Sequence, residues 1–201
     1  PLIDHRGRVV GFGGRTLRDE NPKYLNSPEG LLYQKGRLLY GLFQARRAIA
    51  DCDEVVVVEG YTDVIGLFQA GVGNVVASMG TALTEAQLRL MMRFTRNVTF
   101  MFDADRAGME AVVRSGELAR GLALRPQVAL VPADSDPADV AARAGAEGLE
   151  RILAEKSSLL GFELRRALER NNIETADGRV KAFAEAQAIM AKVSSPKERE
   201  E

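Results

Sequence analysis

The sequence has very few of the residues that crosslink small proteins or bind zinc. Its 201 residues include one cysteine, Cys52, and one histidine, His5. A single cysteine cannot form an internal disulfide, and no group of cysteines and histidines has the spacing of a zinc site. We therefore expect a reducing, cytoplasmic setting. No Ser/His/Asp constellation can be built around His5, so a surface position is expected for that side chain.

Long apolar runs are also missing. Apolar stretches are short and interrupted by charges, far below the ~20 residues that a membrane helix needs, and no signal-peptide pattern opens the chain. The hydrophobic content of 46% is ordinary for a globular protein. We therefore expect no membrane partner. Because Pro1 leads directly into a strand-like stretch, we also expect a piece of a longer polypeptide.

The small net charge conceals an asymmetry along the chain. Residues 1–50 contain nine Lys or Arg and four Asp or Glu, a balance of +5. Because the net charge of the whole chain is −1, the remaining residues carry −6. A basic segment joined to an acidic one indicates a polyanion partner for the first and metal ions for the second.

The middle of the chain alternates between two periodicities. Strand-like runs at 55–59, 74–78, 97–102 and 127–131 alternate with helical patterns at 64–70, 84–95 and 107–120. A short helix is expected after Asp136, and Thr84 is a plausible N-cap. This alternation predicts an α/β fold with a mainly parallel sheet flanked by helices.

The flanking segments differ from this middle part. Before it we expect strand-like runs with a glycine turn at Gly13 and Gly14, a loop over 21–30, and a helix over 37–50. After residue 147 the patterns are only helical, and the terminal KEREE is expected to fray. We therefore divide the chain into a partial basic α+β segment (1–52), an α/β domain (53–145) and a helical appendage (146–201).

Carboxylates follow two of the predicted strands. Glu59 and Asp63 come after the first strand, and Asp103 and Asp105 come after the third. The carboxyl ends of parallel strands meet at one edge of a sheet, so these four acids are expected to converge there. Because Mg²⁺ prefers oxygen ligands and usually takes one or two carboxylates, the pattern predicts a divalent-metal site.

The main alternative is that these acids cap the helices that follow them. It is weaker for the set than for any one acid, because carboxylates crowded at one sheet edge repel unless a cation neutralises them. Asp136 is held extended by Pro137 and could reach the same metal. Equally, Asp136 or Asp139 could start the next helix, with Asp134 solvated.

A second candidate site is the basic loop near the start of the chain. Cations, an aromatic ring and an amide there suit a triphosphate or single-stranded nucleic acid, although a solvated surface loop would have the same composition. The glycines at 11–14 and in MGTALT (79–84) fit tight turns better than nucleotide loops, since neither completes a dinucleotide or Walker pattern. The candidate residues of this loop are Arg15, Lys23, Tyr24, Asn26 and Lys35.

At this point the motifs match a known family. EGYTD, ASMGTALT, FDADRAG and SDPADV, in this order and spacing, resemble the Toprim domain of bacterial primases, topoisomerases and some nucleases. The upstream GFGGRTL, PKYLNSPE and QKGRLLYGLFQAR look like the stretch that precedes Toprim in DnaG-type primases. The resemblance covers residues 2–144, and the combination of GFGGR, KYLNSPE and EGYTD is highly specific.

The resemblance implies a DNA-dependent RNA polymerase that makes short RNA primers on single-stranded DNA in the bacterial cytoplasm, using Mg²⁺ or Mn²⁺. It makes Glu59, Asp103 and Asp105 the central metal-site acids, with Asp63 and Asp136 as further ones. Ala138 stands where the family often has an aspartate, which puts Asp139 in doubt. The basic residues named above would contact ribonucleoside triphosphates and the template.

The resemblance also implies partners and gaps. The partners would be the single-stranded template, the RNA–DNA primer duplex and a replicative helicase. We expect the helicase-binding region and the zinc-binding domain to lie outside this chain, so that primer synthesis needs the whole protein. The alternatives are a Toprim nuclease or topoisomerase, for which no tyrosine has a convincing context, and a non-catalytic DNA-repair module.

Overall fold

The computed structural model describes residues 1–18, 21–79, 82–133 and 135–193. By its packing, the chain forms two units, Pro1–Lys156 and Ser157–Glu201. The division at residues 52 and 145 that the sequence suggested stays a prediction; helix α5 (Pro137–Ala154) runs through the second of those positions.

A parallel sheet forms the centre of the first unit. Its strands β5 (Val55–Val58), β6 (Val75–Ala77), β7 (Asn97–Phe100) and β8 (Arg125–Val128) lie in the order β6-β5-β7-β8, and every pair among them is parallel. All residues of β5 and β6 are buried. Such continuous burial explains why these strands are unbroken valine runs, and the predicted α/β fold with a parallel sheet is confirmed.

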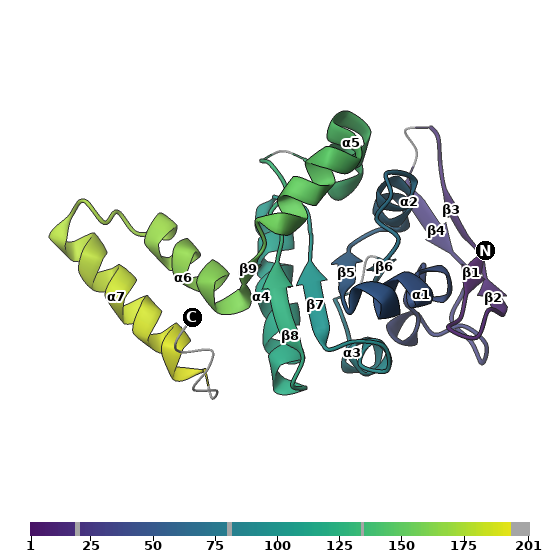
Figure 1. The fold of residues 1–201 in the computed structure, drawn as a ribbon, viewed down its shortest axis with the longest axis horizontal. Helices are drawn as coiled ribbons and strands as arrows, with labels where there is room; N and C mark the ends of the chain where they lie inside the picture. The colour runs from purple at the N-terminus through teal and green to yellow at the C-terminus, as the bar shows by residue number, and fades with distance from the viewer. Residues whose placement is uncertain (19–20, 80–81, 134, 194–201) are drawn as a thin grey trace. The chain divides into compact units, whose positions relative to one another are not determined.

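Helices pack on this sheet in pairs (Figure 1). Helix α2 (Tyr61–Gln69) packs against α5, and their apolar side chains form a core cluster with Val56 and Val58 of β5. Helix α3 (Glu85–Met91) packs against α4 (Arg106–Gly121), which lies along β8. Each fully buried valine or leucine contributes roughly 1.5–3 kcal/mol, so this burial is the main stabilising force of the unit.

Helices α2 and α5 differ from the expected pattern, whereas the cap of α3 follows it. The Thr84 hydroxyl caps α3 by accepting a hydrogen bond from the backbone N–H of Gln87 at 3.2 Å, as predicted. Helix α2 begins at Tyr61, three residues early, because Asp63 lies in its first turn and caps it. Helix α5 is not short: it spans 18 residues, interrupted at Gly145, whose φ of 60° and ψ of −157° are not helical.

The start of the chain corrects one prediction. Strand β1 (Leu2–Ile3) pairs with β2 (Val9–Gly11), and β3 (Gly13–Arg15) pairs with β4 (Tyr24–Asn26), both antiparallel. Gly13 and Gly14 are therefore not a turn: they lie within β3, and the supposed loop contains β4. A Cβ on Gly13 would come within 2.8 Å of Asn26 Oδ1, so any larger residue there would force the Asn26 side chain to move.

The first unit also contains a 3₁₀ turn, η1 (Lys35–Arg37), followed by helix α1 (Leu42–Cys52). This helix begins five residues later than the predicted span of 37–50. The intervening Leu38 and Leu39 are buried, and Tyr40 forms an isolated bridge to Ala77 of β6. Extended pairing at Tyr40 delays the helix, because a residue in a β-bridge cannot also be in the first helical turn.

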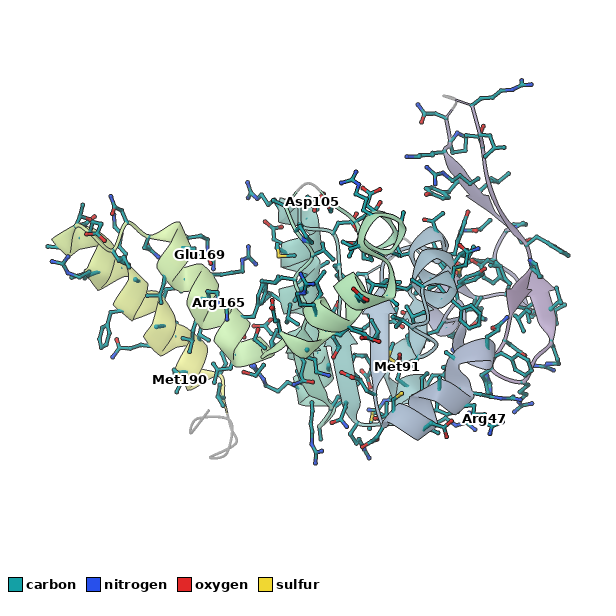
Figure 2. The ribbon with its side chains drawn as sticks, turned by 45° about the horizontal axis from the view of Figure 1, so that its top comes forward. Arg47, Met91, Asp105, Arg165, Glu169 and Met190 are labelled. Carbon is teal, nitrogen blue, oxygen red and sulfur yellow. The ribbon has the colours of Figure 1, made fainter. Side chains whose placement is uncertain are left out.

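The second unit contains the expected helices. After β9 (Ser157–Ser158), α6 (Leu159–Arg170) and α7 (Ala176–Ala191) pack together around a small apolar cluster that includes Leu160 and Ile189. Figure 2 labels Arg165 and Glu169 on α6 and Met190 on α7. The terminal KEREE lies outside the described residues. No described helix combines the length and the apolar character that crossing a membrane requires.

Candidate active site at the carboxyl edge of the sheet

Glu59 and Asp103 lie next to each other at the carboxyl edge of the sheet. They follow the neighbouring parallel strands β5 and β7, and the Glu59 Oε1 atom accepts a hydrogen bond from the backbone N–H of Asp103 at 3.3 Å. Gly108, in the first turn of α4, allows this packing. A Cβ there would lie 2.3 Å from the Asp103 carbonyl oxygen and 3.0 Å from Glu59 Oε1, which explains the glycine of FDADRAG.

Asp105 and Asp136 act as helix caps. Asp105 Oδ1 accepts from the backbone N–H of Gly108 at 2.7 Å, and Asp136 Oδ1 accepts from that of Asp139 at 2.6 Å. Figure 2 labels Asp105 where α4 begins. For Asp105 and Asp136, the alternative interpretation as helix caps is therefore correct for one oxygen of each carboxylate. Asp139 lies 3.7 Å from Arg143 in an exposed ion pair on α5.

Asp63 is the most buried acid of this edge, with 5% of its surface exposed. Its Oδ2 atom accepts from the backbone N–H of Gly60 at 2.9 Å and completes a capping box on α2. Burial raises the pKa of Asp63 to about 6, against the lowering effect of the Gly60 hydrogen bond and with a further increase from Asp136 and Asp103. This carboxyl group therefore titrates near neutral pH.

The other acids also raise one another's pKa. Burial raises the pKa of Glu59, and the negative charge of Asp103 raises it further. Burial also raises the pKa of Asp103, with additional repulsion from Asp136 and Asp105. The Oδ1 atom of Asp103 is buried and has no hydrogen-bond partner among the described residues. A buried carboxylate oxygen without a donor, among like charges, is the environment that a bound cation would relieve.

The described residues do not form a complete metal-binding site by themselves. In the part of the chain that is described, no three His, Cys, Asp or Glu side chains form a group that could hold a metal ion. This does not argue against Mg²⁺, because that ion usually takes only one or two carboxylates and completes its shell with waters and substrate phosphates. Glu59 and Asp103 fit such a site.

The predicted basic residues gather partly on the β3–β4 hairpin. The Arg15 guanidinium lies over the Tyr24 ring, 5.3 Å from its centroid. Tyr24 meets Tyr61 edge to face at 5.4 Å, and the Tyr61 hydroxyl donates to the Gly14 carbonyl at 3.0 Å. Tyr61 thus fastens the hairpin to the start of α2, two residues after Glu59. We did not identify Tyr61 from the sequence, although it lies in EGYTD.

The remaining candidates have different surroundings. Lys23 is exposed at the hairpin, and Asn26 has a buried Oδ1 atom without a hydrogen-bond partner. Lys35 lies on a separate element, η1, where its backbone N–H donates to Glu29 Oε1 at 2.7 Å. The structure therefore brings Arg15 and Tyr24 together, whereas Lys35 belongs to a different element. Gly80 and Thr81 of the MGTALT turn lie outside the described residues, as does Asp134.

Comparison with known families covers most of the chain. A family profile described as "Toprim-like" matches residues 56–141, and one described as "DNA primase catalytic core, N-terminal domain" matches residues 1–46. A third, described as "DnaB-helicase binding domain of primase", matches residues 160–201. The sequence had led us to expect the helicase-binding region outside this chain, whereas the third match lies within its second unit.

Individual relatives agree with these matches. The chain is 41% identical over 201 residues to a DNA primase of Halalkalibacterium halodurans, covering 100% of this chain and 34% of that protein. It superimposes with a TM-score of 0.86 and 38% identity on the RNA polymerase domain of Mycobacterium tuberculosis primase DnaG in complex with double-stranded DNA, covering 100% of this chain and 66% of that one.

A DnaG primase catalytic domain bound to single-stranded DNA gives a TM-score of 0.83 at 36% identity, covering 99% of this chain and 65% of that one. The chain spans about a third of the length of the curated relatives that it matches. The fold, the motifs and these likenesses agree, and the chain belongs to the DnaG-type DNA primases, of which it carries the Toprim domain.

Proposed function

We propose that the chain carries the catalytic acids of a primase, which joins ribonucleotides into short RNA primers on single-stranded DNA. The observation that supports this most is the pairing of Glu59 with Asp103 at the sheet edge. One oxygen of Asp103 is buried without a hydrogen-bond donor, and the pKa values of both acids are raised. Such an arrangement costs stability, so it is better explained by function.

Glu59 and Asp103 would hold a divalent cation, Mg²⁺ or Mn²⁺. Asp105, Asp136 and Asp63 each use one carboxylate oxygen in a helix cap, so their second oxygens could assist. When bound, such a cation neutralises the charge on a triphosphate and stabilises the developing negative charge during phosphoryl transfer. The chain itself supplies the carboxylates and holds them by their packing on β5, β7 and α4.

The basic residues would bind the anionic substrates. Arg15, Lys23, Tyr24, Asn26 and Lys35 offer point charges for phosphates, an aromatic face for a base and an amide for hydrogen bonding. The ligands that we propose are ribonucleoside triphosphates, the single-stranded template and the RNA–DNA primer duplex. Related primase domains have been solved bound to single-stranded DNA and in complex with double-stranded DNA, which supports DNA as a partner.

We further propose that the second unit takes part in binding the replicative helicase at the bacterial replication fork. The profile described as the DnaB-helicase binding domain of primase matches residues 160–201, which contain α6 and α7. Exposed apolar side chains on these helices, such as Phe183 with 65% exposure, suit a protein partner.

The test of the catalytic proposal is template-dependent incorporation of ribonucleotides by the whole protein in which this chain occurs. With Mg²⁺ and single-stranded DNA, we expect short RNA products that are lost in Asp103→Ala. If the protein cleaves DNA and incorporates no ribonucleotide, the Toprim nuclease alternative replaces this proposal.

A further inference from the structure

Gln87 is buried completely, with 0% of its surface exposed, although it lies in the first turn of α3. Its Nε2 atom donates to two backbone carbonyls of the basic segment: to that of Leu38 at 2.7 Å and to that of Lys35 at 3.2 Å. Both donors of this amide are therefore used to hold residues about fifty positions earlier in the chain. No ordinary helix-capping function requires these bonds.

The acceptor side of Gln87 completes the arrangement. Its Oε1 atom accepts from the backbone N–H of Thr84 at 2.9 Å, as in a capping box. The Thr84 hydroxyl, which caps α3, also donates to the Gly36 carbonyl at 2.6 Å. The carbonyls of Lys35, Gly36 and Leu38 are thus all held by this one capping box. We call these contacts of Thr84 and Gln87 the α3 clamp.

The segment is also fixed from its other side. The Lys35 backbone N–H donates to Glu29 Oε1 at 2.7 Å, and Leu38 is buried in a cluster with Tyr33. The Lys35 backbone is therefore held at both its N–H and its carbonyl. Within the described residues, the Lys35 ammonium forms no ion pair with a carboxylate. A rigid backbone carrying an unpaired cation is suited to binding an anion in a fixed position.

We propose that Gln87 is a positioning residue, which acts through the α3 clamp to hold the Lys35 ammonium where it binds the phosphates of a nucleotide. This inference depends on the proposed function, because it takes Lys35 as a nucleotide contact. It assigns Thr84 and Gln87 a different function from phosphate binding. Their side chains organise the basic segment, and Lys35 touches the ligand.

The test measures binding of ATP with Mn²⁺ to the chain by calorimetry. Lys35→Ala removes a charged hydrogen-bond donor and should weaken ATP binding about tenfold or more. Gln87→Met keeps the side-chain length but removes every printed hydrogen bond of the Gln87 side chain. It should weaken ATP binding about three- to tenfold, because the ammonium is misplaced but not removed. In the Lys35→Ala background, Gln87→Met should cause no further loss.

Three further variants separate positioning from folding. Gln87→Leu is a second neutral replacement that removes the same hydrogen bonds without burying a charge, so it should weaken ATP binding like Gln87→Met even if the latter folds poorly. Asn74→Leu removes another buried amide, which bonds the Glu54 carbonyl at 3.0 Å, and should lower the melting temperature without changing ATP affinity. Thr84→Ser keeps the hydroxyl and should bind ATP normally. Mn²⁺ affinity without ATP should stay unchanged in all of them.

Unchanged ATP affinity in both Gln87 variants would overturn the inference, as would a Gln87→Met effect that persists at full size in the Lys35→Ala background. If Lys35→Ala itself leaves ATP affinity unchanged, the inference fails together with the assignment of Lys35. Failure of the proposed catalytic function would look different, because the parent chain would then bind no Mn²⁺.

Discussion

The carboxylates at the two ends of the central sheet differ in their hydrogen-bond partners. At the amino end, Asp53 accepts from the Thr95 hydroxyl at 2.8 Å and from the Asn97 amide at 3.1 Å. Glu54 there accepts from Thr99 and from the Lys156 ammonium. At the carboxyl end, one buried oxygen of Asp103 has no donor among the described residues. Strand β5 joins the two ends, because Glu54 precedes it and Glu59 follows it. The acids at the amino end are exposed or partly exposed and find side-chain donors, whereas neighbouring carboxylates at the carboxyl end raise the pKa values of Glu59, Asp63 and Asp103.

We attribute this difference to a division between acids that stabilise the fold and acids that we propose for catalysis. Carboxylates paired with hydroxyls, amides and an ammonium hold the strand ends together, whereas crowded carboxylates with raised pKa values oppose folding. Residues at functional sites commonly break the rules that the rest of the structure obeys. Substitutions at one end of the sheet at a time test this contrast between the two groups of acids.

The largest effect is expected for Glu59→Gln at the carboxyl edge. Loss of this carboxylate should lower ribonucleotide incorporation by the whole protein about a hundredfold or more, since it removes a proposed metal ligand. The free energy of unfolding should not fall, because burial already disfavours the charged form. Glu54→Gln is the matched control at the amino end. This control should be less stable than the parent and bind the metal normally. If Glu54→Gln instead kept its stability and lost metal binding, the proposed difference between the two ends of the sheet would be contradicted.

The next effect concerns pH and Asp63. Its pKa of about 6 in the folded chain lies above the ordinary 3.8, so the folded state binds a proton that the unfolded chain releases between these values. Asp63 therefore favours folding below about pH 4, and this contribution, about 3 kcal/mol, is lost as the pH rises through about 6.

Urea unfolding with EDTA at several pH values should show this slope in the parent and a shallower one in Asp63→Asn. Asp51→Asn, at an exposed position on α1, is the control and should keep the parent slope. An equal slope in Asp63→Asn and the parent would mean that Asp63 does not titrate in this range.

Lys156→Met should have a smaller effect at the amino end. It leaves Glu54, whose side chain is 19% exposed, without its cation, which should cost about 1–2 kcal/mol. Chemical denaturation measures this loss, while calorimetry with Mn²⁺ should give the parent affinity. Lys181→Met is the control, because that lysine pairs with Asp177 on the exposed surface of α7. A changed Mn²⁺ affinity in Lys156→Met would show that the two ends are coupled.

The smallest effect is expected for Tyr61→Phe, which tests how the hairpin is held beside the acidic edge. The change removes only the hydrogen bond to the Gly14 carbonyl and should cost about 1 kcal/mol or less. The ring contacts with Tyr24 and Tyr40 remain. ATP affinity should therefore fall less in Tyr61→Phe than in Tyr61→Ala, and equal losses would contradict a role for the ring.

Much of the fold follows from local sequence pattern. The valine run of β5 and the alternation of strands with helices predict a parallel sheet, and its carboxyl edge predicts where Glu59 and Asp103 meet. The Thr84 cap is also a local signal. These features were predictable because each depends on neighbours in the chain or on a general rule of α/β topology.

The remaining features depend on contacts between distant residues. Gly13 looks like a turn residue until Asn26 is placed opposite it in β4. By its place three residues after Thr84, Gln87 looks like a simple capping residue. Its bonds to Lys35 and Leu38 could not be predicted, because the sequence does not show that these parts of the chain are adjacent. Likewise, the raised pKa of Asp63 depends on its burial and on the charges of Asp136 and Asp103, which are distant from it in the sequence.

The most direct test of the contrast between the two ends is a calorimetric titration of the chain with Mn²⁺, in parallel with Asp103→Ala. We predict that the parent binds Mn²⁺ and that the affinity of Asp103→Ala is at least about a hundredfold lower. An absence of binding by the parent, or equal binding by the parent and Asp103→Ala, would contradict a metal site at the carboxyl edge.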